Sequence, residues 1–185
     1  MDFSVPHINC SADPYWDGYR TQILESVEKF KSEHPEDAVD GDGIITDYHY
    51  NVKNKITPEY KEAVYKSMTG AIMWTARGFD KDYRRLKIKN LWFQETSGPV
   101  SHGVHTHGPL GLSGVLFVDY DPEVHKSTRL ISPQLHPWEG THIEEEPWVE
   151  EGNVLIFPSY LLHEQLPSFS TKKRLIVAFN LHYEE

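Results

Sequence analysis

Three histidines within six residues, His102, His105 and His107, are the residues of this sequence best suited to chemistry. A fourth, His163, follows a second apolar run further along the chain. Neutral imidazole is the commonest side-chain ligand for metal ions. Residues two apart on a strand project to the same face, so His105 and His107 can bind one ion together. With His163 as the third ligand, coordination positions remain open for a reactant.

The number and type of these ligands favour one class of metal site over another. Two histidines and a third ligand on one face, with open positions, are typical of a non-haem Fe(II) oxygenase site. A closed zinc site needs four ligands, and the single cysteine, Cys10, lies far away in an unpatterned segment. His102 is three residues from His105, so on a regular strand the two would face opposite sides. We therefore expect His102 to lie in a loop or to support the ligands from outside.

Arg174 opens an otherwise apolar run, Leu175–Phe179. A guanidinium is rarely buried without a partner, and it binds carboxylates through two parallel hydrogen bonds. The partner is either an acidic residue of the chain or the carboxylate of a bound cosubstrate. We expect the runs 152–158 and 174–181 to be antiparallel neighbours, which would bring His163 and Arg174 into one pocket.

Two helices are predicted in the first third of the chain. Asp13-Pro14 predicts a helix start by its capping and first-turn residues, and the helical spacing continues to about Glu33. Thr57-Pro58 predicts a second helix that runs to about Arg77, where Gly78 ends it. Ile44–Val52 is predicted to form a short strand. The residues predicted to face inward are Tyr19, Ile23, Leu24, Val27, Phe30, Tyr60, Ala63, Val64, Met68, Ile72 and Trp74.

From Leu86 onward the pattern changes to period two and to apolar runs bounded by turns, which predicts strands. No internal repeat or linker divides the chain. We predict a single α+β, mainly β domain over residues 1–185. In it, a helical buttress over about 1–85 supports a barrel of two antiparallel sheets, jelly-roll or cupin-like, over 86–185. The predicted strands are Leu86–Thr96, Leu112–Tyr120, Arg129–Ser132, His142–Glu145, Val154–Phe157 and Arg174–His182.

Composition narrows the partners. The net charge of −10 disfavours nucleic-acid binding in general. A local basic stretch, Lys81–Lys89, is interpreted as the solvent face of a strand whose Leu86 and Ile88 point inward. The chain has no signal-like N-terminus and no apolar run near the roughly 20 residues that span a bilayer, which predicts a soluble, cytoplasmic protein without membrane contact.

Two segments resemble a known family. One contains His105-Thr106-His107 followed by the Leu112–Val118 strand; the other runs from the Val154–Pro158 strand through His163 to Arg174 and Asn180. They resemble the 2-oxoglutarate/Fe(II)-dependent oxygenases, and within them a prolyl-hydroxylase-related bacterial and phage group. The resemblance covers roughly the C-terminal half and implies a double-stranded β-helix fold.

The resemblance also implies roles for individual residues. It makes His105, His107 and His163 the ligands of Fe(II), with 2-oxoglutarate and O2 as cosubstrates. It makes Arg174 the anchor of the distal carboxylate of 2-oxoglutarate, with Ser113 and Asn180 as polar neighbours of the cosubstrate and Trp92 and Tyr160 as candidates for substrate contact. The implied reaction is hydroxylation of a substrate, a small molecule or a protein side chain, coupled to oxidative decarboxylation of 2-oxoglutarate.

One departure from the superfamily pattern concerns the second ligand. The superfamily usually has an acidic residue two positions after the first histidine, and His107 stands there. The departure leaves open a different metal, or an acidic ligand such as Asp119 that is supplied from elsewhere in place of His107.

Two other functions remain open at this point. A cupin-type metalloenzyme could use three histidines without 2-oxoglutarate, and it would have no need of Arg174 as an anchor. A non-catalytic β-barrel binding module would have no reason to collect paired histidines at one mouth. The sequence sets neither the substrate nor the oligomeric state.

Overall fold

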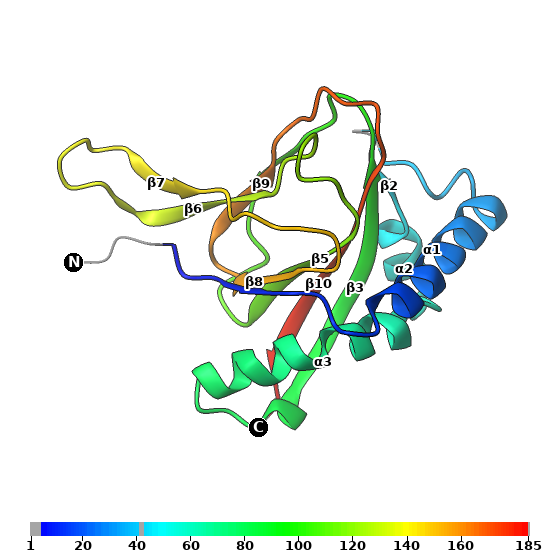
Figure 1. The fold of residues 1–185 in the computed structure, drawn as a ribbon, viewed down its shortest axis with the longest axis horizontal. Coiled ribbons are helices and arrows are strands. Elements are labelled where there is room, and N and C mark those ends of the chain that lie inside the picture. The colour runs from blue at the N-terminus through cyan, green and yellow to red at the C-terminus, as the bar shows by residue number, and fades with distance from the viewer. Residues whose placement is uncertain (1–4, 41–42, 185) are drawn as a thin grey trace.

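Two antiparallel sheets form the centre of the computed structural model, which describes residues 5–40 and 43–184 (Figure 1). The larger sheet has six strands in the order β1-β8-β5-β10-β3-β2, and the smaller has four in the order β4-β9-β6-β7. The larger sheet contains β1 (Ile8–Cys10), β2 (Ile45–Thr46), β3 (Leu86–Thr96), β5 (Leu112–Asp119), β8 (Val154–Pro158) and β10 (Arg174–Tyr183). The smaller sheet contains β4 (His102–His105), β6 (Thr128–Leu135), β7 (His142–Glu145) and β9 (Leu162–Gln165).

The helices lie beside the long strands, away from the projecting β6–β7 hairpin (Figure 1). They are α1 (Trp16–Glu33), α2 (Tyr48–Asn54), α3 (Lys61–Gly78) and the short 3-10 helix η1 (Tyr83–Arg85). Apolar residues of α1 and α3 form one core with the facing side of the six-stranded sheet. None of the described helices is long and apolar enough to cross a membrane.

Side chains of the six-stranded sheet alternate between two cores, and β10 shows this most clearly. Val177 and Phe179 pack in the core against the helices. Ile176 and Ala178 pack in a second core, between the two sheets. Arg174 has the same parity as Ile176, so the alternation of a strand turns the guanidinium into the space between the sheets.

Gly114 allows the middle of β5 to pack tightly against its neighbours. A Cβ at this position would lie 2.2 Å from the ring of Phe179 and 2.9 Å from the carbonyl oxygen of Leu155. A larger residue would push β5 away from β10 and β8. The strand that follows the histidines therefore depends on glycine at this point.

The predicted helices and long strands are confirmed, with shifts of a few residues at their ends. Ile23, Val27, Tyr60 and Met68 are buried as expected. Trp74, however, is 62% exposed, so its predicted inward position is wrong. It lies two residues after the buried Ile72, about 200° around the helix, and so points to the opposite side.

The predicted strand at Ile44–Val52 is wrong for most of its length. Only Ile45–Thr46 pair with β3, and α2 begins at Tyr48. Asp47 ends the strand because its carboxylate is drawn inward: it accepts hydrogen bonds from the backbone N–H of Phe93 (2.9 Å) and the hydroxyl of Tyr60 (2.6 Å).

The predicted direct pairing of the runs 152–158 and 174–181 is also wrong. β5 lies between β8 and β10 and is antiparallel to both, so β8 and β10 run parallel to each other. The shared pocket of His163 and Arg174 arises in another way, through β9 of the opposite sheet.

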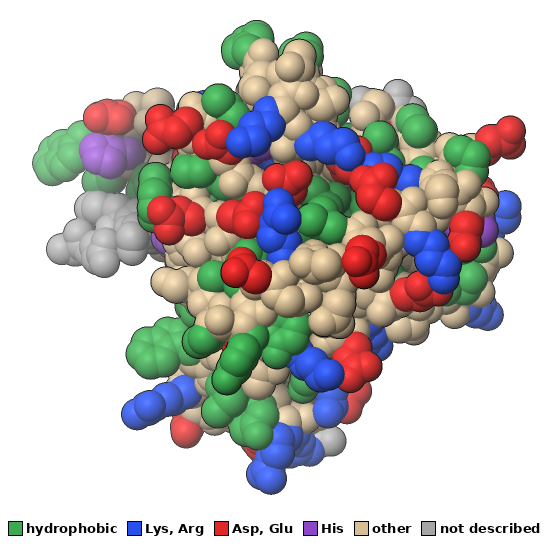
Figure 2. Space-filling view, turned by 45° about the vertical axis from the view of Figure 1, so that its right-hand side comes forward, with side chains coloured by type: hydrophobic (Ala, Val, Ile, Leu, Met, Phe, Trp, Pro, Cys, Tyr) green, Lys and Arg blue, Asp and Glu red, His purple; other side chains and the backbone are tan. Residues whose placement is uncertain are grey.

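The surface mixes acidic and basic side chains over its upper part, and green hydrophobic groups gather below, next to Lys and Arg (Figure 2). Figure 2 is turned about the vertical axis of Figure 1, so each element keeps its height in the picture. The lower part of Figure 2 therefore corresponds to α3 and η1. The exposed apolar residues in these elements and in the segment between them include Met73, Phe79 and Tyr83. In the Lys81–Lys89 stretch, Leu86 is buried, Ile88 is half-buried and the lysines are exposed, which confirms the predicted solvent face.

Candidate active site

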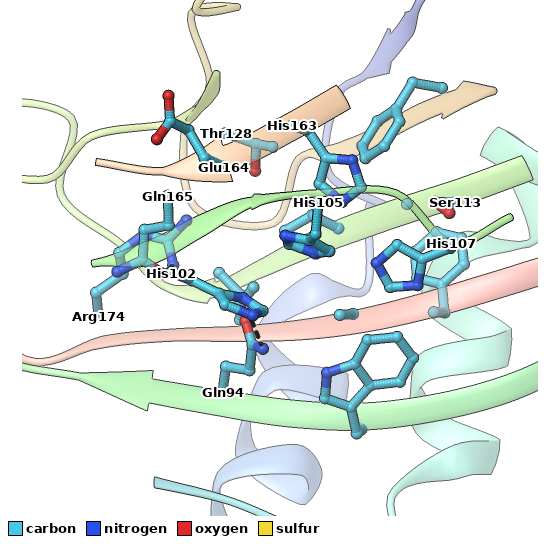
Figure 3. Close-up of a pocket in the computed structure, with 17 residues that line it drawn as sticks. Gln94, His102, His105, His107, Ser113, Thr128, His163, Glu164, Gln165 and Arg174 are labelled. Atoms are coloured by element: carbon cyan, nitrogen blue, oxygen red, sulfur yellow. Dashed lines mark hydrogen bonds between the residues drawn. The ribbon is translucent and has the colours of Figure 1, made fainter. Parts of the chain in front are cut away.

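Three histidines converge at one end of the space between the two sheets (Figure 3). His105 ends β4 and is the register partner of His163 on β9. His107 follows two residues later, where its backbone N–H donates to the carbonyl oxygen of Ser159 at 3.0 Å. One ligand nitrogen from each ring lies within 4.8 Å of the others. This spacing is that of three groups around a single ion.

Two of the rings have their orientation set by the backbone. The Nδ1 of His105 lies 2.7 Å from the carbonyl oxygen of Gly103, and the Nδ1 of His163 lies 2.9 Å from that of Leu161. A carbonyl only accepts, so each Nδ1 carries the proton and donates. The Nε2 of each ring then keeps its lone pair for a metal, as in many metal-binding histidines.

Burial keeps two of the imidazoles neutral. Burial is the largest cause that lowers the pKa of His163 to about 3 and that of His107 to about 4, and the neighbouring histidines contribute to both shifts. A neutral imidazole is the form that binds a metal ion. Both rings are therefore ready to act as ligands at neutral pH.

Aromatic side chains hold the histidine rings in place. Trp92 of β3 stacks on His107, with ring centroids 5.5 Å apart and an angle of 19° between the planes. Phe157 of β8 meets His163 edge-on at 4.7 Å. Trp92 is only 5% exposed, so its indole mainly supports His107 and shows little surface to solvent.

His102 is closer to the cluster than the sequence predicts. It opens β4, and its ring lies 4.3 Å from that of His105, on the same side of the strand. The pairing of β4 with β9 shifts register between the two residues, and this irregularity cancels the expected alternation. The expectation that His102 and His105 face opposite sides is therefore wrong.

Arg174 lies at the other end of the same cavity (Figure 3). It is 2% exposed and makes two hydrogen bonds, from Nη1 to Oε1 of Gln165 (2.7 Å) and from Nε to the carbonyl oxygen of Lys126 (3.2 Å). No carboxylate of the described chain forms a salt bridge with it, which rules out the acidic-residue partner among these residues. Burial lowers its pKa to about 10, so the guanidinium still carries its charge at neutral pH.

The cavity between the two ends is narrow and is lined from both sheets. Ser113 lines it at the histidine end, where its hydroxyl donates to Oδ1 of Asn180 at 3.0 Å. Asn180 itself lines the cleft that opens in front of the histidines. Neither residue lies beside Arg174, as the strand register shows, because Asn180 is six residues along β10.

Two other candidate residues lie outside this cavity. Tyr160, in the turn between β8 and β9, is 51% exposed and lines neither the cavity nor the cleft. Asp119 ends β5, and its carboxylate faces Arg20 at 3.5 Å. Asp119 is therefore not part of the histidine cluster, which contains no carboxylate among the described residues.

An open cleft of about 570 Å³ lies in front of the histidines. It is bounded by His102, His105 and His107 on one side and by Tyr48 and His49 at the start of α2 on the other. Trp92 lines both this cleft and the narrow cavity. The histidines thus stand between a closed space that ends at Arg174 and an open one that a larger molecule can enter.

Two polar residues of the cavity were missed by sequence reasoning. Gln165 holds Arg174 with its carbonyl oxygen and donates from Nε2 to Thr96 at 3.1 Å. Gln94 lies 3.4 Å from Nδ1 of His102. The signal for Gln165 was its position two residues after His163, which places both on one face of β9.

Comparisons with known proteins agree with this geometry. Residues 90–180 match a family model described as "Putative 2OG-Fe(II) oxygenase". The chain belongs to the 2OG-Fe(II) oxygenases. It is therefore an enzyme that uses Fe(II), 2-oxoglutarate and O2, and three imidazoles with open positions are a donor set that suits Fe(II). No curated protein sequence gives a significant match.

Solved oxygenase structures share the fold at low identity. A Pseudomonas putida prolyl-4-hydroxylase superposes with a TM-score of 0.62 at 16% identity, covering 98% of this chain and 95% of that one. The epimerase SnoN from nogalamycin biosynthesis gives 0.67 at 11% identity, covering 96% and 77%. The collagen prolyl hydroxylase of Paramecium Bursaria Chlorella virus-1 gives 0.56 at 12%, covering 97% and 96%. These likenesses confirm the double-stranded β-helix fold.

Proposed function

We propose that His105, His107 and His163 bind Fe(II) and that Arg174 binds the distal carboxylate of 2-oxoglutarate, in an oxygenase that hydroxylates a substrate held in the open cleft. Fe(II) held there supplies the activation of O2 that is coupled to oxidative decarboxylation of 2-oxoglutarate. The substrate is a small molecule or a protein side chain.

One observation carries the proposal. A fully buried guanidinium, without a carboxylate partner in the described chain, lies in the same narrow cavity as three converging imidazoles. A buried, uncompensated charge is strongly destabilising, so the fold keeps Arg174 at a cost that an anionic ligand offsets. 2-Oxoglutarate has a carboxylate for the guanidinium and a keto acid group for a metal at the other end.

The residues around the cavity have distinct tasks in this account. Gln165 and the carbonyl of Lys126 orient the guanidinium so that its remaining N–H groups can donate to a carboxylate. Gly103 and Leu161 fix the ligand rings through their carbonyls. Phe117 and Tyr120, whose rings lie 5.8 and 5.9 Å from the guanidinium carbon, exclude water from its surroundings. All of them reduce the reorganisation needed when the cosubstrate binds.

The test is 2-oxoglutarate turnover in the absence of added substrate, measured as succinate formed with and without Fe(II). We expect slow Fe(II)-dependent turnover in the parent protein, its loss in His105→Ala, and its loss in Arg174→Met. The exposed Trp138→Ala variant at the tip of the β6–β7 hairpin is the matched control and should keep the parent rate. Undiminished turnover in Arg174→Met would contradict the assignment of the anchor.

A further inference from the structure

A second groove continues from the cleft in front of the histidines. Its volume is about 330 Å³, and it shares Tyr48, Asn90 and Trp92 with the cleft. It runs between α2 and β3 and ends at the first residue of α3, Lys61. A molecule that reaches the histidines through the cleft can therefore extend into this groove.

The floor of the groove is an edge of β3 that no strand of the described residues pairs with. Five consecutive residues of β3, from Ile88 to Trp92, line it. β2 pairs with β3 only at Gln94 and Glu95, and among the described residues no strand pairs with the rest of that edge. Such an edge leaves backbone donors and acceptors free to pair with an added strand.

The edge is closed off only where it approaches the cluster. The N–H of Phe93 donates to Asp47, and the carbonyl oxygen of Phe93 accepts from the hydroxyl of Thr46 at 2.6 Å. These two side chains satisfy the backbone where β2 ends. Toward the N-terminal end of β3, no such side chain of the described residues caps the edge, and the groove lies beside it. The apolar side chains of Val52 and Ile56, which are 61% and 45% exposed, line the groove there.

The far part of the groove is basic. Lys55, Lys61 and Lys89 line it, and no aspartate or glutamate among the described residues does. None of the three forms a salt bridge with a described carboxylate. The chain as a whole has a net charge of −10, whereas the three lysines give this groove a positive local charge. A positive groove favours an anionic partner.

We propose that this groove binds an extended acidic peptide segment, which adds to the edge of β3 and places its acidic side chains on Lys55, Lys61 and Lys89 while another of its residues lies in the cleft at the histidines. The substrate is then a protein side chain flanked by acidic residues. This last step rests on the proposed function, whereas the binding of the peptide does not.

A peptide suits the groove better than a nucleic acid does. The unpaired edge offers the alternating N–H and C=O groups that a peptide backbone matches. The groove walls away from the cleft are aliphatic, at Val52, Ile56 and Ile88, and offer no platform on which successive bases could stack.

The experiment measures fluorescence anisotropy with two labelled pools of ten-residue peptides. The pools are randomised alike, except that one has three consecutive glutamates where the other has three glutamines, and a labelled ten-residue oligothymidine is the third probe. The protein is the full chain loaded anaerobically with Fe(II) and 2-oxoglutarate. We expect the glutamate pool to bind about tenfold more tightly than the glutamine pool, as three partly exposed ion pairs would give.

Two charge-matched variants locate the effect. Lys55→Gln/Lys61→Gln/Lys89→Gln should remove the preference, while Lys53→Gln/Lys81→Gln/Lys87→Gln, with the same loss of charge at lysines that do not line the groove, should keep it. Val52→Glu, at an exposed position that does not endanger folding, should weaken the glutamate pool. Equal binding of both pools, the same loss in both triple variants, or tighter binding of the oligothymidine would each overturn the proposal.

Backbone pairing has its own readout. Hydrogen exchange in residues 88–92 should slow when the glutamate pool is bound, and unchanged exchange there would overturn strand addition. The result is separable from the proposed function, because His105→Ala should lose turnover and still bind the glutamate pool. The groove triple variant should still turn over 2-oxoglutarate without substrate.

Discussion

The two ends of the narrow cavity differ in every physical respect that bears on binding. The histidine end offers nitrogen lone pairs and is built from two four-residue strands, β4 and β9, and a loop. The Arg174 end is a buried cation that offers only donors and is fixed by the ten-residue strand β10. One end can bind a cation and the other an anion. The cavity therefore suits a ligand that bridges its two ends. A mutation at one end should weaken binding there and leave binding at the other end unchanged.

The largest effect should come from removing a ligand at the histidine end. His163→Ala should lower Fe(II) affinity by at least about 100-fold and abolish turnover, because even the loss of a residue that merely supports a ligand costs about 10- to 100-fold. Equilibrium dialysis with Fe(II) under anaerobic conditions measures this. His142→Ala, a histidine of β7 away from the cluster, is the control, and an unchanged Fe(II) affinity in His163→Ala would remove His163 from the site.

A change at the other end should separate the two halves. Arg174→Met should raise the half-saturating concentration of 2-oxoglutarate by roughly 100-fold or more and leave Fe(II) affinity unchanged, because breaking a buried ion pair costs about 3–5 kcal/mol. The apo-protein should be as stable as the parent or more stable, since a buried cation is replaced by an apolar chain. Binding isotherms and thermal unfolding check both statements. Loss of Fe(II) binding in this variant would show that the ends are not separable.

Gln165 allows a finer test of the Arg174 end, because its side-chain hydrogen bonds go to Arg174 and Thr96 and none goes to the metal-binding histidines. Gln165→Leu removes the acceptor that holds Nη1 of Arg174, so 2-oxoglutarate binding should weaken by about tenfold, the equivalent of one hydrogen bond to a charged group. Fe(II) affinity should not change, and Gln165→Glu should not restore 2-oxoglutarate binding, because its carboxylate would compete with the cosubstrate for the guanidinium. Restoration by glutamate would contradict the positioning role.

The smallest effect is expected where this chain departs from the wider superfamily. His107→Asp should keep Fe(II) binding and turnover within about tenfold of the parent, because a carboxylate is also a ligand for Fe(II) in sites of this type. His107→Ala should lose far more. Equal Fe(II) affinity and equal turnover in the two variants would mean that His107 is not a ligand, and another residue would have to take its place in the site.

The same comparison shows what the sequence could predict. The Arg174 end follows from alternation: a charged residue at the start of a regular apolar strand takes its direction from Ile176 and Ala178, which pack between the sheets. The predicted strand and its bounds were close to those found. The absence of a carboxylate partner could not be read from the chain, because that depends on which sheet faces the arginine.

The histidine end was harder to predict in detail. The spacing of His105 and His107 predicted the pair, and His163 the third group, but β4 and β9 are too short to leave a periodic signal. The register shift in β4 turned His102 toward the cluster, and only the pairing with β9 reveals it. Likewise, the hydrogen bonds of the Asp47 carboxylate with Phe93 and Tyr60 mark the point where β2 ends and α2 begins. They are tertiary contacts, so the local sequence could not predict them.

An anaerobic titration of the apo-protein with Fe(II) and then 2-oxoglutarate, followed by visible spectroscopy, tests directly whether the histidines bind iron and Arg174 anchors 2-oxoglutarate. We expect a charge-transfer band of the chelate in the parent protein. His105→Ala should show no band because it does not bind iron. Arg174→Met should bind iron but show no band at a moderate concentration of 2-oxoglutarate. Iron binding by the parent without any band, or a full-strength band in Arg174→Met at the same 2-oxoglutarate concentration, would contradict these assignments.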